Sequence, residues 1–215
     1  MLIILKLKFF HNMSKLLITG ATGFLGTMLC EDLKFKNYVI NTSTRSNKKK
    51  IIEGIKNFNV GEINSETKWS EALFGIECVI HCAARAHMMK EKKNDILKSY
   101  RKVNVEGTKN LAIQAAASGV KRFIFISSIK VNGEQTIGSS SFRTNDIPKP
   151  EDAYGISKWE AEQALWAISK KTGLEIVIIR PPLVYGKGVK GNFLRLLDFA
   201  NKSVPLPLAK IKNCR

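Results

Sequence analysis

The stretch KLLITGATGFLG, residues 15–26, decides the fold of this chain. It opens with a short apolar run, which predicts a buried strand over residues 15–19. Three glycines follow, and apolar side chains then recur at helical spacing over residues 24–35. Glycines allow a tight turn, and a helix N-terminus presents unpaired N–H groups to an anion. The stretch therefore predicts a strand–turn–helix unit whose turn can hold the pyrophosphate of a dinucleotide.

The rest of the chain alternates between short apolar runs and longer helical patterns. Further strands are predicted over residues 38–42, 57–60, 78–82, 122–127 and 174–180, and helices over 67–73, 95–118, 153–172 and 192–201. Because the strands are continuously apolar, both faces of their sheet must be covered. This predicts an α/β fold, a Rossmann-like doubly wound parallel sheet with helices on both faces.

We expect three regions along the chain. Residues 1–13 read as an extension or a disordered tail, residues 14–182 as the dinucleotide-binding domain, and residues 183–215 as the start of a substrate-binding region. Met13 stands just before the first strand and is an alternative start to Met1. The apolar beginning of the chain is interrupted by Lys6 and Lys8, and nothing reaches the roughly 20 apolar residues of a membrane span.

The chain of 215 residues carries 35 Lys and Arg against 18 Asp and Glu, a formal net charge of +17. Such charge fits a nucleic-acid or membrane surface, an anionic substrate, or a solvated surface. Of the cations, 27 are Lys, the strongly hydrated surface cation, so we favour the solvated surface and expect no nucleic-acid or membrane partner. A hydrophobic share of 44% excludes a disordered or collagen-like chain.

Cysteine and histidine usage predicts no metal site. The four cysteines form neither a CxxC pair nor a zinc spacing, and the chain has only three histidines. His81 reads as a histidine at the end of a strand, and His87 as a residue that could face a substrate. Reduced core thiols favour a cytoplasmic protein.

A second pattern, YGISK at residues 154–158, carries candidate chemistry. Positions four apart lie on one face of a helix, so Tyr154 and Lys158 can point into one pocket. A nearby ammonium, together with the positive ring of an oxidised nicotinamide, favours the phenolate of a tyrosine. Tyr154 could then exchange a proton with a substrate hydroxyl, while Ser128, at the end of a predicted strand, holds the same oxygen.

Several segments in order resemble the extended short-chain dehydrogenase/reductases, within the NAD-dependent epimerase/dehydratase family. They are GATGFLG at 20–26, NVEGT at 104–108, SS at 127–128, YGISK at 154–158, RPP at 180–182 and VYG at 184–186. The resemblance implies an NAD(P)-dependent UDP-sugar 4-epimerase or 4-keto-reductase, acting in surface polysaccharide or O-antigen synthesis. Dehydratases of this family carry Asp-Glu after the catalytic hydroxyl, whereas this chain has Ile129-Lys130, which disfavours dehydration.

The resemblance also implies the residues of the site. As catalytic residues it gives Ser128, Tyr154 and Lys158. As cofactor-binding residues it gives Gly20, Thr22, Gly23, Phe24, Leu25, Gly26, Arg45, Glu62, Ile63, Cys82, Ala83, Ala84, Asn104, Lys158 and Pro181. As substrate-binding residues it gives Arg85, Ser128 and Asn192. The family pattern SSxxVYG is changed at one place, where Asn132 replaces the usual Tyr.

The choice between NAD and NADP depends on the end of the second strand. An acidic residue there would bind the ribose 2′-hydroxyl of NAD. The chain offers no carboxylate over residues 41–45, and Arg45 and Lys48 could meet a 2′-phosphate. The sequence therefore leans slightly toward NADP, with Glu62 at the family's adenine-contacting position.

Family members are longer than this chain, so we expect most of the substrate domain to be missing. Cofactor binding should then survive while turnover is weak or lost, because reaction rates depend on substrate positioning. The alternative is a non-catalytic NAD(P)-binding protein from a split or decaying gene. A small-molecule nucleotide sugar is the expected partner, and a homodimer is possible.

Overall fold

The computed structural model describes residues 15–36, 38–46, 52–86, 93–136, 140–186, 188–189 and 192–202. The chain divides into two compact units, Met1–Pro182 and Leu183–Arg215. The first unit holds the sheet and its helices, and the second holds helix α6 (Asn192–Asn201). The predictions for residues 1–13 lie outside the described residues.

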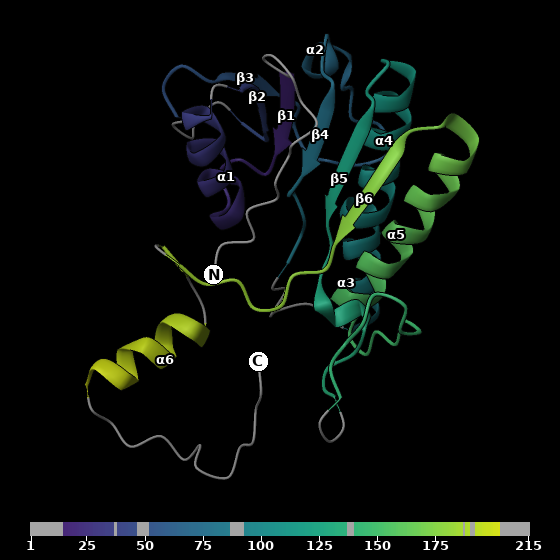
Figure 1. Ribbon diagram of the computed structural model, residues 1–215. Helices are drawn as coiled ribbons and strands as arrows, with labels where there is room; N and C mark the ends of the chain where they lie inside the picture. The colour runs from purple at the N-terminus through teal and green to yellow at the C-terminus, as the bar shows by residue number, and fades with distance from the viewer. Residues whose placement is uncertain are drawn as a thin grey trace. The chain divides into compact units, whose positions relative to one another are not determined.

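A parallel sheet forms the centre of the first unit (Figure 1). Its strands are β1 (Lys15–Thr19), β2 (Val39–Thr44), β3 (Lys56–Asn59), β4 (Cys78–His81), β5 (Arg122–Ile126) and β6 (Glu175–Ile179). They lie in the order β3-β2-β1-β4-β5-β6, and every neighbouring pair is parallel. This is the Rossmann order, so the predicted fold class is confirmed. The order reverses between β1 and β4, which opens a crevice at the carboxyl ends of these strands.

The apolar run of β1 feeds two cores because successive side chains of a strand point to opposite faces. Leu16 and Ile18 pack with Cys30 and Leu33 of helix α1 (Phe24–Phe35). Leu17 points to the other face, into a larger core that includes residues of α4 (Thr108–Ala117) and α5 (Ala153–Thr172). Both cores exclude water from the sheet, which explains why the strands are continuously apolar.

Helix α5 begins and ends at recognisable sequence signals. The Asp152 carboxylate accepts the Gly155 N–H at 2.6 Å, which caps the N-terminus. Gly173, with φ of 76°, ends the helix in the left-handed conformation. Lys170 and Lys171 lie in the last turn, where cations complement the helix dipole. The predicted bounds of α1 and α5 agree with the structure.

The single helix predicted over residues 95–118 is wrong in its middle. The structure has α3 (Lys93–Tyr100), then a π-helical segment η1 (Arg101–Gly107), then α4. π-Helical turns are rare and need compensating contacts. Here the segment contains Asn104, whose buried amide bonds groups on two other elements. Those hydrogen bonds offset the weaker geometry of the wide turn.

The helix predicted over residues 67–73 is shorter than expected. Helix α2 covers only Ser70–Leu73, because the preceding loop bonds to α4 instead. Asn110 donates to the carbonyl of Thr67 at 2.8 Å, and Gln114 donates to the same oxygen at 2.8 Å. Gln114 also accepts the Trp69 N–H at 2.8 Å. A carbonyl already bonded to side chains is not available to extend the helix.

Candidate functional site

The glycine turn between β1 and α1 is held by close backbone contacts. Gly20 has φ of 70°, and its carbonyl accepts the Gly23 N–H at 2.9 Å. A Cβ at Gly20 would lie 2.7 Å from the backbone N of Ala83, and one at Gly26 would lie 2.2 Å from the carbonyl oxygen of Gly20. Glycine is therefore required at both positions for the helix, the turn and the loop after β4 to pack.

The start of α1 suits an anion. Its N-cap residue is Gly23, no side chain caps the helix, and no acidic residue lies in the first turn. The backbone N–H groups of that turn therefore keep their partial positive charge, while Thr22 and Gly23 are exposed. With the close-packed glycines beneath, these residues fit the pyrophosphate of a dinucleotide.

Buried polar side chains, hydrogen-bonded in a row, stabilise the glycine turn from inside the fold. The His81 ring lies at the end of β4, with Nδ1 2.6 Å from Thr19 Oγ1 and Nε2 2.9 Å from Thr108 Oγ1. The Ala83 N–H donates to Thr19 Oγ1 at 3.2 Å. Burial, with repulsion from Lys158, lowers the pKa of His81 from 6.5 to about 3. Neutral His81 thus joins β1, β4 and α4 and is a structural histidine, as the sequence predicted.

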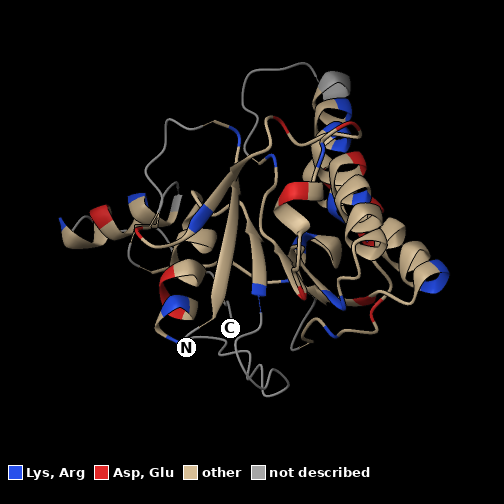
Figure 2. Ribbon diagram, turned by 90° about the horizontal axis from the view of Figure 1, so that it is seen from above, with Lys and Arg blue, Asp and Glu red and all other residues tan. Residues whose placement is uncertain are grey.

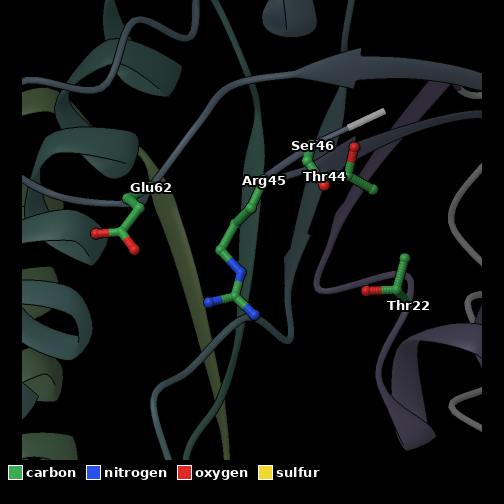
Figure 3. Close-up of a pocket in the computed structure, with 5 residues that line it drawn as sticks. All are labelled: Thr22, Thr44, Arg45, Ser46 and Glu62. Atoms are coloured by element: carbon green, nitrogen blue, oxygen red, sulfur yellow. The ribbon is translucent and has the colours of Figure 1, made fainter. Parts of the chain in front are cut away.

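A pocket of about 270 Å³ lies beside the turn, at the carboxyl ends of β2 and β3 (Figure 3). It is lined by Thr22, Thr44, Arg45, Ser46 and Glu62. In this view the Arg45 side chain extends between Glu62 on one side and Thr22 on the other. The pocket therefore brings together one guanidinium, one carboxylate and three hydroxyls, next to the anion-binding turn.

Glu62 is held in place by the loop that shortens α2. The Thr67 hydroxyl donates to the carbonyl of Glu62 at 2.8 Å and accepts the Asn64 N–H at 2.9 Å. The neighbouring Ile63 side chain is buried in the larger core, close to Gly107 of η1. The backbone at Glu62 is thus anchored on both sides, while its carboxylate is exposed.

The second group of predicted residues lies on α5. Lys158 is 1% exposed, and its Nζ lies 4.0 Å from the centroid of the Phe125 ring. Burial lowers the pKa of Lys158 from 10.5 to about 7, with Cys82 and Glu162 opposing the shift. The ammonium is therefore easily deprotonated in the chain by itself.

Tyr154 lies one turn before Lys158 on α5. Its ring packs edge-on against Tyr100, with centroids 5.8 Å apart. Burial raises the pKa of Tyr154 above 10, Asp152 and Tyr100 add to the shift, and Lys130 opposes it. Burial thus opposes the phenolate that a nearby ammonium would favour, because the desolvation of the charged phenolate outweighs the positive charge of Lys130.

Ser128 is the second residue after the end of β5. Its Oγ accepts the Lys130 N–H at 3.3 Å and so caps the short helix η2 (Ile129–Val131). The Lys130 ammonium pairs with Asp152, the N-cap residue of α5, at 2.5 Å. A Cβ at Gly155 would lie 2.9 Å from the Lys130 carbonyl oxygen. These contacts bring the Ser128 segment and the start of the Tyr154 helix together.

Asn104 joins the loop after β4 to α5. Its Oδ1 accepts the Arg85 N–H at 2.8 Å, and its Nδ2 donates to the Arg85 carbonyl at 3.1 Å and to Ser157 Oγ at 3.0 Å. The Ser157 hydroxyl in turn donates to the carbonyl of Tyr154 at 2.8 Å. Asn104 therefore holds two segments of the site in register, and its contact with a cofactor stays a prediction.

The predicted residues gather at one edge of the sheet, because the carboxyl ends of parallel strands share an edge. The glycine turn, Arg45 and Glu62 follow β1, β2 and β3, while Cys82, Ala83 and Ala84 follow β4. Ser128 follows β5, and Pro181 follows β6. Lys48, His87 and the side chain of Asn192 lie outside the described residues.

Charge is spread over the molecule. Lys and Arg residues occur on several helices and loops, among Asp and Glu residues (Figure 2). Within the described ranges, no group of three or more His, Cys, Asp or Glu residues could hold a metal ion. No helix in the described part of the chain has the length and apolar character needed to cross a membrane.

Sequence reasoning missed several residues that build the site. Four of them stand inside the segments quoted above without an assigned role, and only the fold brings all five beside the predicted groups. They are Thr19, Thr108, Ser157, Glu162 and Arg180. Glu162 lies four residues after Lys158 and eight after Tyr154, so its helical spacing was the one available signal.

Comparison with known proteins agrees with this geometry. The model of the NAD dependent epimerase/dehydratase family matches residues 16–211. The chain belongs to this family. A UDP-glucose 4-epimerase of Vibrio cholerae is 50% identical over 197 residues, which are 91% of this chain and 60% of that protein.

Two further members of the family extend the comparison. The N-acetyl-alpha-D-glucosaminyl-diphospho-ditrans,octacis-undecaprenol 4-epimerase of Escherichia coli O157:H7 is 31% identical over 189 residues, 84% of this chain and 52% of that protein. The UDP-glucuronic acid 4-epimerase of Bacillus cereus, solved with UDP-glucuronic acid and NAD, is 26% identical with a TM-score of 0.75, covering 89% of this chain and 64% of that one. The chain thus spans about half to two thirds of the length of these relatives.

The glycine turn makes a specific prediction for Gly20→Ala, with Gly119→Ala as the matched control. Both glycines have positive φ, so both alanines should cost about 1–2 kcal/mol of backbone strain. Only Gly20 would also meet the backbone of Ala83, whereas Gly119 faces open space. Gly20→Ala should therefore lose further stability and lower cofactor affinity by at least about tenfold, equivalent to 1.4 kcal/mol. Chemical denaturation and cofactor titration measure both, and equal effects of the two variants would contradict the close-packed turn.

The lowered pKa of His81 predicts that the folded chain loses stability in acid. Unfolded His81 takes up a proton below pH 6.5, whereas the folded residue stays neutral down to about pH 3. Protonation therefore favours the unfolded chain, and the free energy of unfolding should fall by up to about 1.4 kcal/mol per pH unit below 6.5 from this residue. His81→Gln should be less stable at pH 7.5 but show a shallower fall between pH 6.5 and 4.5. Parallel stability curves for the two proteins would rule out this role.

Proposed function

We propose that this chain is the cofactor-binding and catalytic part of an NAD(P)-dependent nucleotide-sugar enzyme that acts at C4 of the sugar. A UDP-sugar 4-epimerase is the first proposal, supported by the 50% identity to the Vibrio cholerae UDP-glucose 4-epimerase. A 4-keto-reductase is the alternative, since it uses the same groups. The observation that carries the proposal is the placement of Tyr154, Lys158 and Ser128 at the sheet edge that also holds the glycine turn.

In this proposal each side chain has a separate task. Tyr154 exchanges a proton with the C4 hydroxyl, and the Ser128 hydroxyl binds the same oxygen. Bound NAD(P) supplies a hydride acceptor and donor, and its oxidised ring also supplies positive charge. That charge is needed here, because burial in the free chain raises the pKa of Tyr154 and lowers that of Lys158.

The groups beside Ser128 support a reaction without loss of water. Dehydration needs an acid and a base at the sugar, and the dehydratases of the family carry Asp-Glu there for that purpose. Here the two positions are Ile129 and Lys130, and the Lys130 ammonium pairs with Asp152 at 2.5 Å and Glu134 at 3.0 Å. Epimerisation or reduction at C4 needs proton exchange at Tyr154 and hydride exchange with the nicotinamide cofactor, and no second acid and base for the loss of water.

Tyr154→Phe tests the catalytic proposal, with Tyr38→Phe as the matched control. Tyr38 is half-buried beside the smaller core, and losing its hydroxyl should leave activity unchanged. Tyr154→Phe removes the proton-exchanging group and should lower kcat by roughly 100-fold or more. Interconversion of UDP-glucose and UDP-galactose, followed by proton NMR with NAD or NADP added, measures the rate.

The same experiment separates the enzyme from a non-catalytic binding protein. Turnover of a UDP-sugar by the wild-type chain that is lost in Tyr154→Phe would support the enzyme and contradict the non-catalytic binding protein. Tight cofactor binding with little or no turnover is the result expected of a chain that spans only about half to two thirds of its relatives. Equal turnover by wild type and Tyr154→Phe would contradict the role of the tyrosine alone.

For the cofactor, we propose NADP over NAD. Residues 41–46 of the second strand and its end carry no carboxylate, and the pocket there offers the Arg45 guanidinium with the hydroxyls of Thr44 and Ser46. This donor set suits a ribose 2′-phosphate. Glu62, across the pocket, would bind the adenine side of the same molecule. Solved relatives contain NAD, so the proposal concerns this chain's own pocket.

Arg45→Ala tests the cofactor proposal, with Lys121→Ala as a control for lost charge. Lys121 is exposed at the opposite end of β5. Losing a charged hydrogen bond of about 1.5–3 kcal/mol predicts a fall of at least tenfold in NADPH affinity for Arg45→Ala, with NADH affinity nearly unchanged. Fluorescence of the bound reduced cofactors measures both constants. A wild-type preference for NADH, or an equal fall for both cofactors, would overturn the proposal.

Two finer proposals concern the biosynthetic role and the oligomeric state. A part in surface polysaccharide or O-antigen synthesis is supported by the Escherichia coli relative, whose name gives a sugar diphosphate of undecaprenol as its substrate. The homodimer, named above as possible, stays a prediction.

A further inference from the structure

A buried ion pair lies beneath the catalytic residues. Glu162 of α5 is fully buried, and Arg180, directly after β6, grips its carboxylate with two hydrogen bonds, Nε to Oε1 at 3.0 Å and Nη2 to Oε2 at 2.6 Å. The remaining Arg180 nitrogen, Nη1, donates to Asn132 Oδ1 at 3.1 Å. Neither charge belongs to the proposed chemistry, so the pair needs another explanation.

The ion pair reaches the residue next to the catalytic serine. The Ser127 hydroxyl donates to Glu162 Oε1 at 2.5 Å. On either side of Ser128 the backbone is also bonded to the end of β6, with the Ser127 N–H on the Ile179 carbonyl at 2.7 Å and the Ile129 N–H on the Pro181 carbonyl at 3.0 Å. Ser128 is therefore held by its neighbours on both sides. In the sequence, Arg180 lies between Ile179 and Pro181, whose carbonyls accept these two hydrogen bonds.

One helix face connects this pair to the proton-exchanging tyrosine. Tyr154, Lys158 and Glu162 follow one another at four-residue intervals on α5, so they share a face. Lys158 and Glu162 are both buried on that face. A rigid helix therefore fixes the distance from Glu162 to Tyr154, while the Ser127 bond fixes the distance from Glu162 to the serine segment.

We propose that Glu162 and Arg180, acting through Ser127, position Ser128 relative to Tyr154. We name Ser127, Asn132, Glu162 and Arg180 the Glu162 clamp. Its members are positioning residues, because the clamp acts on the substrate only through Ser128. This inference rests on the proposed function, because it gives the fixed position of Ser128 a role in the proposed reaction.

Asn132 extends the clamp to the loop that follows. Its Oδ1 accepts from Arg180, and its Nδ2 donates to the Arg143 carbonyl at 3.2 Å. The amide can do both at once because it carries a donor and an acceptor. The change from the family's usual Tyr to Asn132 therefore gives this chain a polar link between the clamp and the loop over residues 140–150.

The energetics of buried charge indicate that the ion pair serves to position residues and not to stabilise the fold. Desolvating two charges costs several kcal/mol per ion, and apolar replacements of buried pairs are often neutral or stabilising. The same two strands carry a second bidentate pair at their other end, Arg122 with Glu175, where Glu175 is 54% exposed. That pair joins β5 to β6 without burying its carboxylate, whereas the carboxylate of Glu162 on α5 is fully buried.

Ser127→Ala and Arg180→Lys test the proposal in the full chain, with Glu175→Gln as the matched control. Ser127→Ala leaves the buried ion pair intact, so it should fold. Arg180→Lys keeps the positive charge but loses the two-pronged geometry of the guanidinium. Glu175→Gln weakens a bidentate pair on the same strands, away from the site. Amide hydrogen exchange and steady-state kinetics with a UDP-sugar are measured on all four proteins.

The clamp predicts a local effect. In Ser127→Ala, the amides of residues 127–131 should exchange roughly fivefold faster, the effect of one lost hydrogen bond of about 1 kcal/mol, while the rest of β5 and β6 is unchanged. The value of kcat should fall about tenfold with KM and cofactor affinity within twofold, because an interaction made only in the transition state is lost. Arg180→Lys should show the same pattern, and Glu175→Gln should match wild type in both measurements.

Other results would overturn the inference. In Ser127→Ala, the amides of residues 127–131 could exchange at the wild-type rate, or no faster than the same amides in Glu175→Gln. Either result would show that the clamp does not order the serine segment. Wild-type kinetics in Ser127→Ala together with faster exchange would show that this order does not serve the reaction. In a wild-type chain whose turnover is too weak for the kinetic comparison, the exchange comparison alone decides whether the clamp holds Ser128.

Discussion

The parallel pairing of β1 with β2 on one side and β4 on the other is the constraint on which the site depends. Because the chain runs outward from β1 in both directions, the loops after β1 and β4 separate at the carboxyl edge. The gap is kept narrow by Gly20, where any side chain would meet the backbone of Ala83. The anion-binding turn, the pocket at Arg45 and the groups on α5 all face the edge that this pairing creates.

Buried polar groups hold that edge together. His81 joins β1, β4 and α4 as a neutral ring, Asn104 joins the loop after β4 to α5, and Glu162 joins α5 to the ends of β5 and β6. Each of these three side chains is hydrogen-bonded to a segment that carries a predicted site residue. Since unpaired buried polar groups cost free energy, each bond also specifies one arrangement of the elements it connects.

Two residues of α5, Tyr154 and Lys158, have pKa values that burial shifts toward the neutral form. Burial raises the pKa of Tyr154 and lowers the pKa of Lys158 to about 7. A cationic ring placed beside them would favour the phenolate, so bound cofactor and reactive tyrosine are coupled electrostatically. The same burial would make the charge of a cofactor effective at Tyr154, because the local dielectric is low.

The sequence by itself determined the strand–turn–helix unit at residues 15–35, the alternation that requires a doubly wound sheet, and the bounds of α5, because these depend on local periodicity, glycines and caps. It also identified Ser128, Tyr154 and Lys158 as the candidates for chemistry. Only the tertiary structure decided the π-helical turn at Asn104, the shortened α2, the raised pKa of Tyr154 and the clamp at Glu162 and Arg180. These depend on contacts and desolvation between segments far apart in the chain, which no local pattern of residues records.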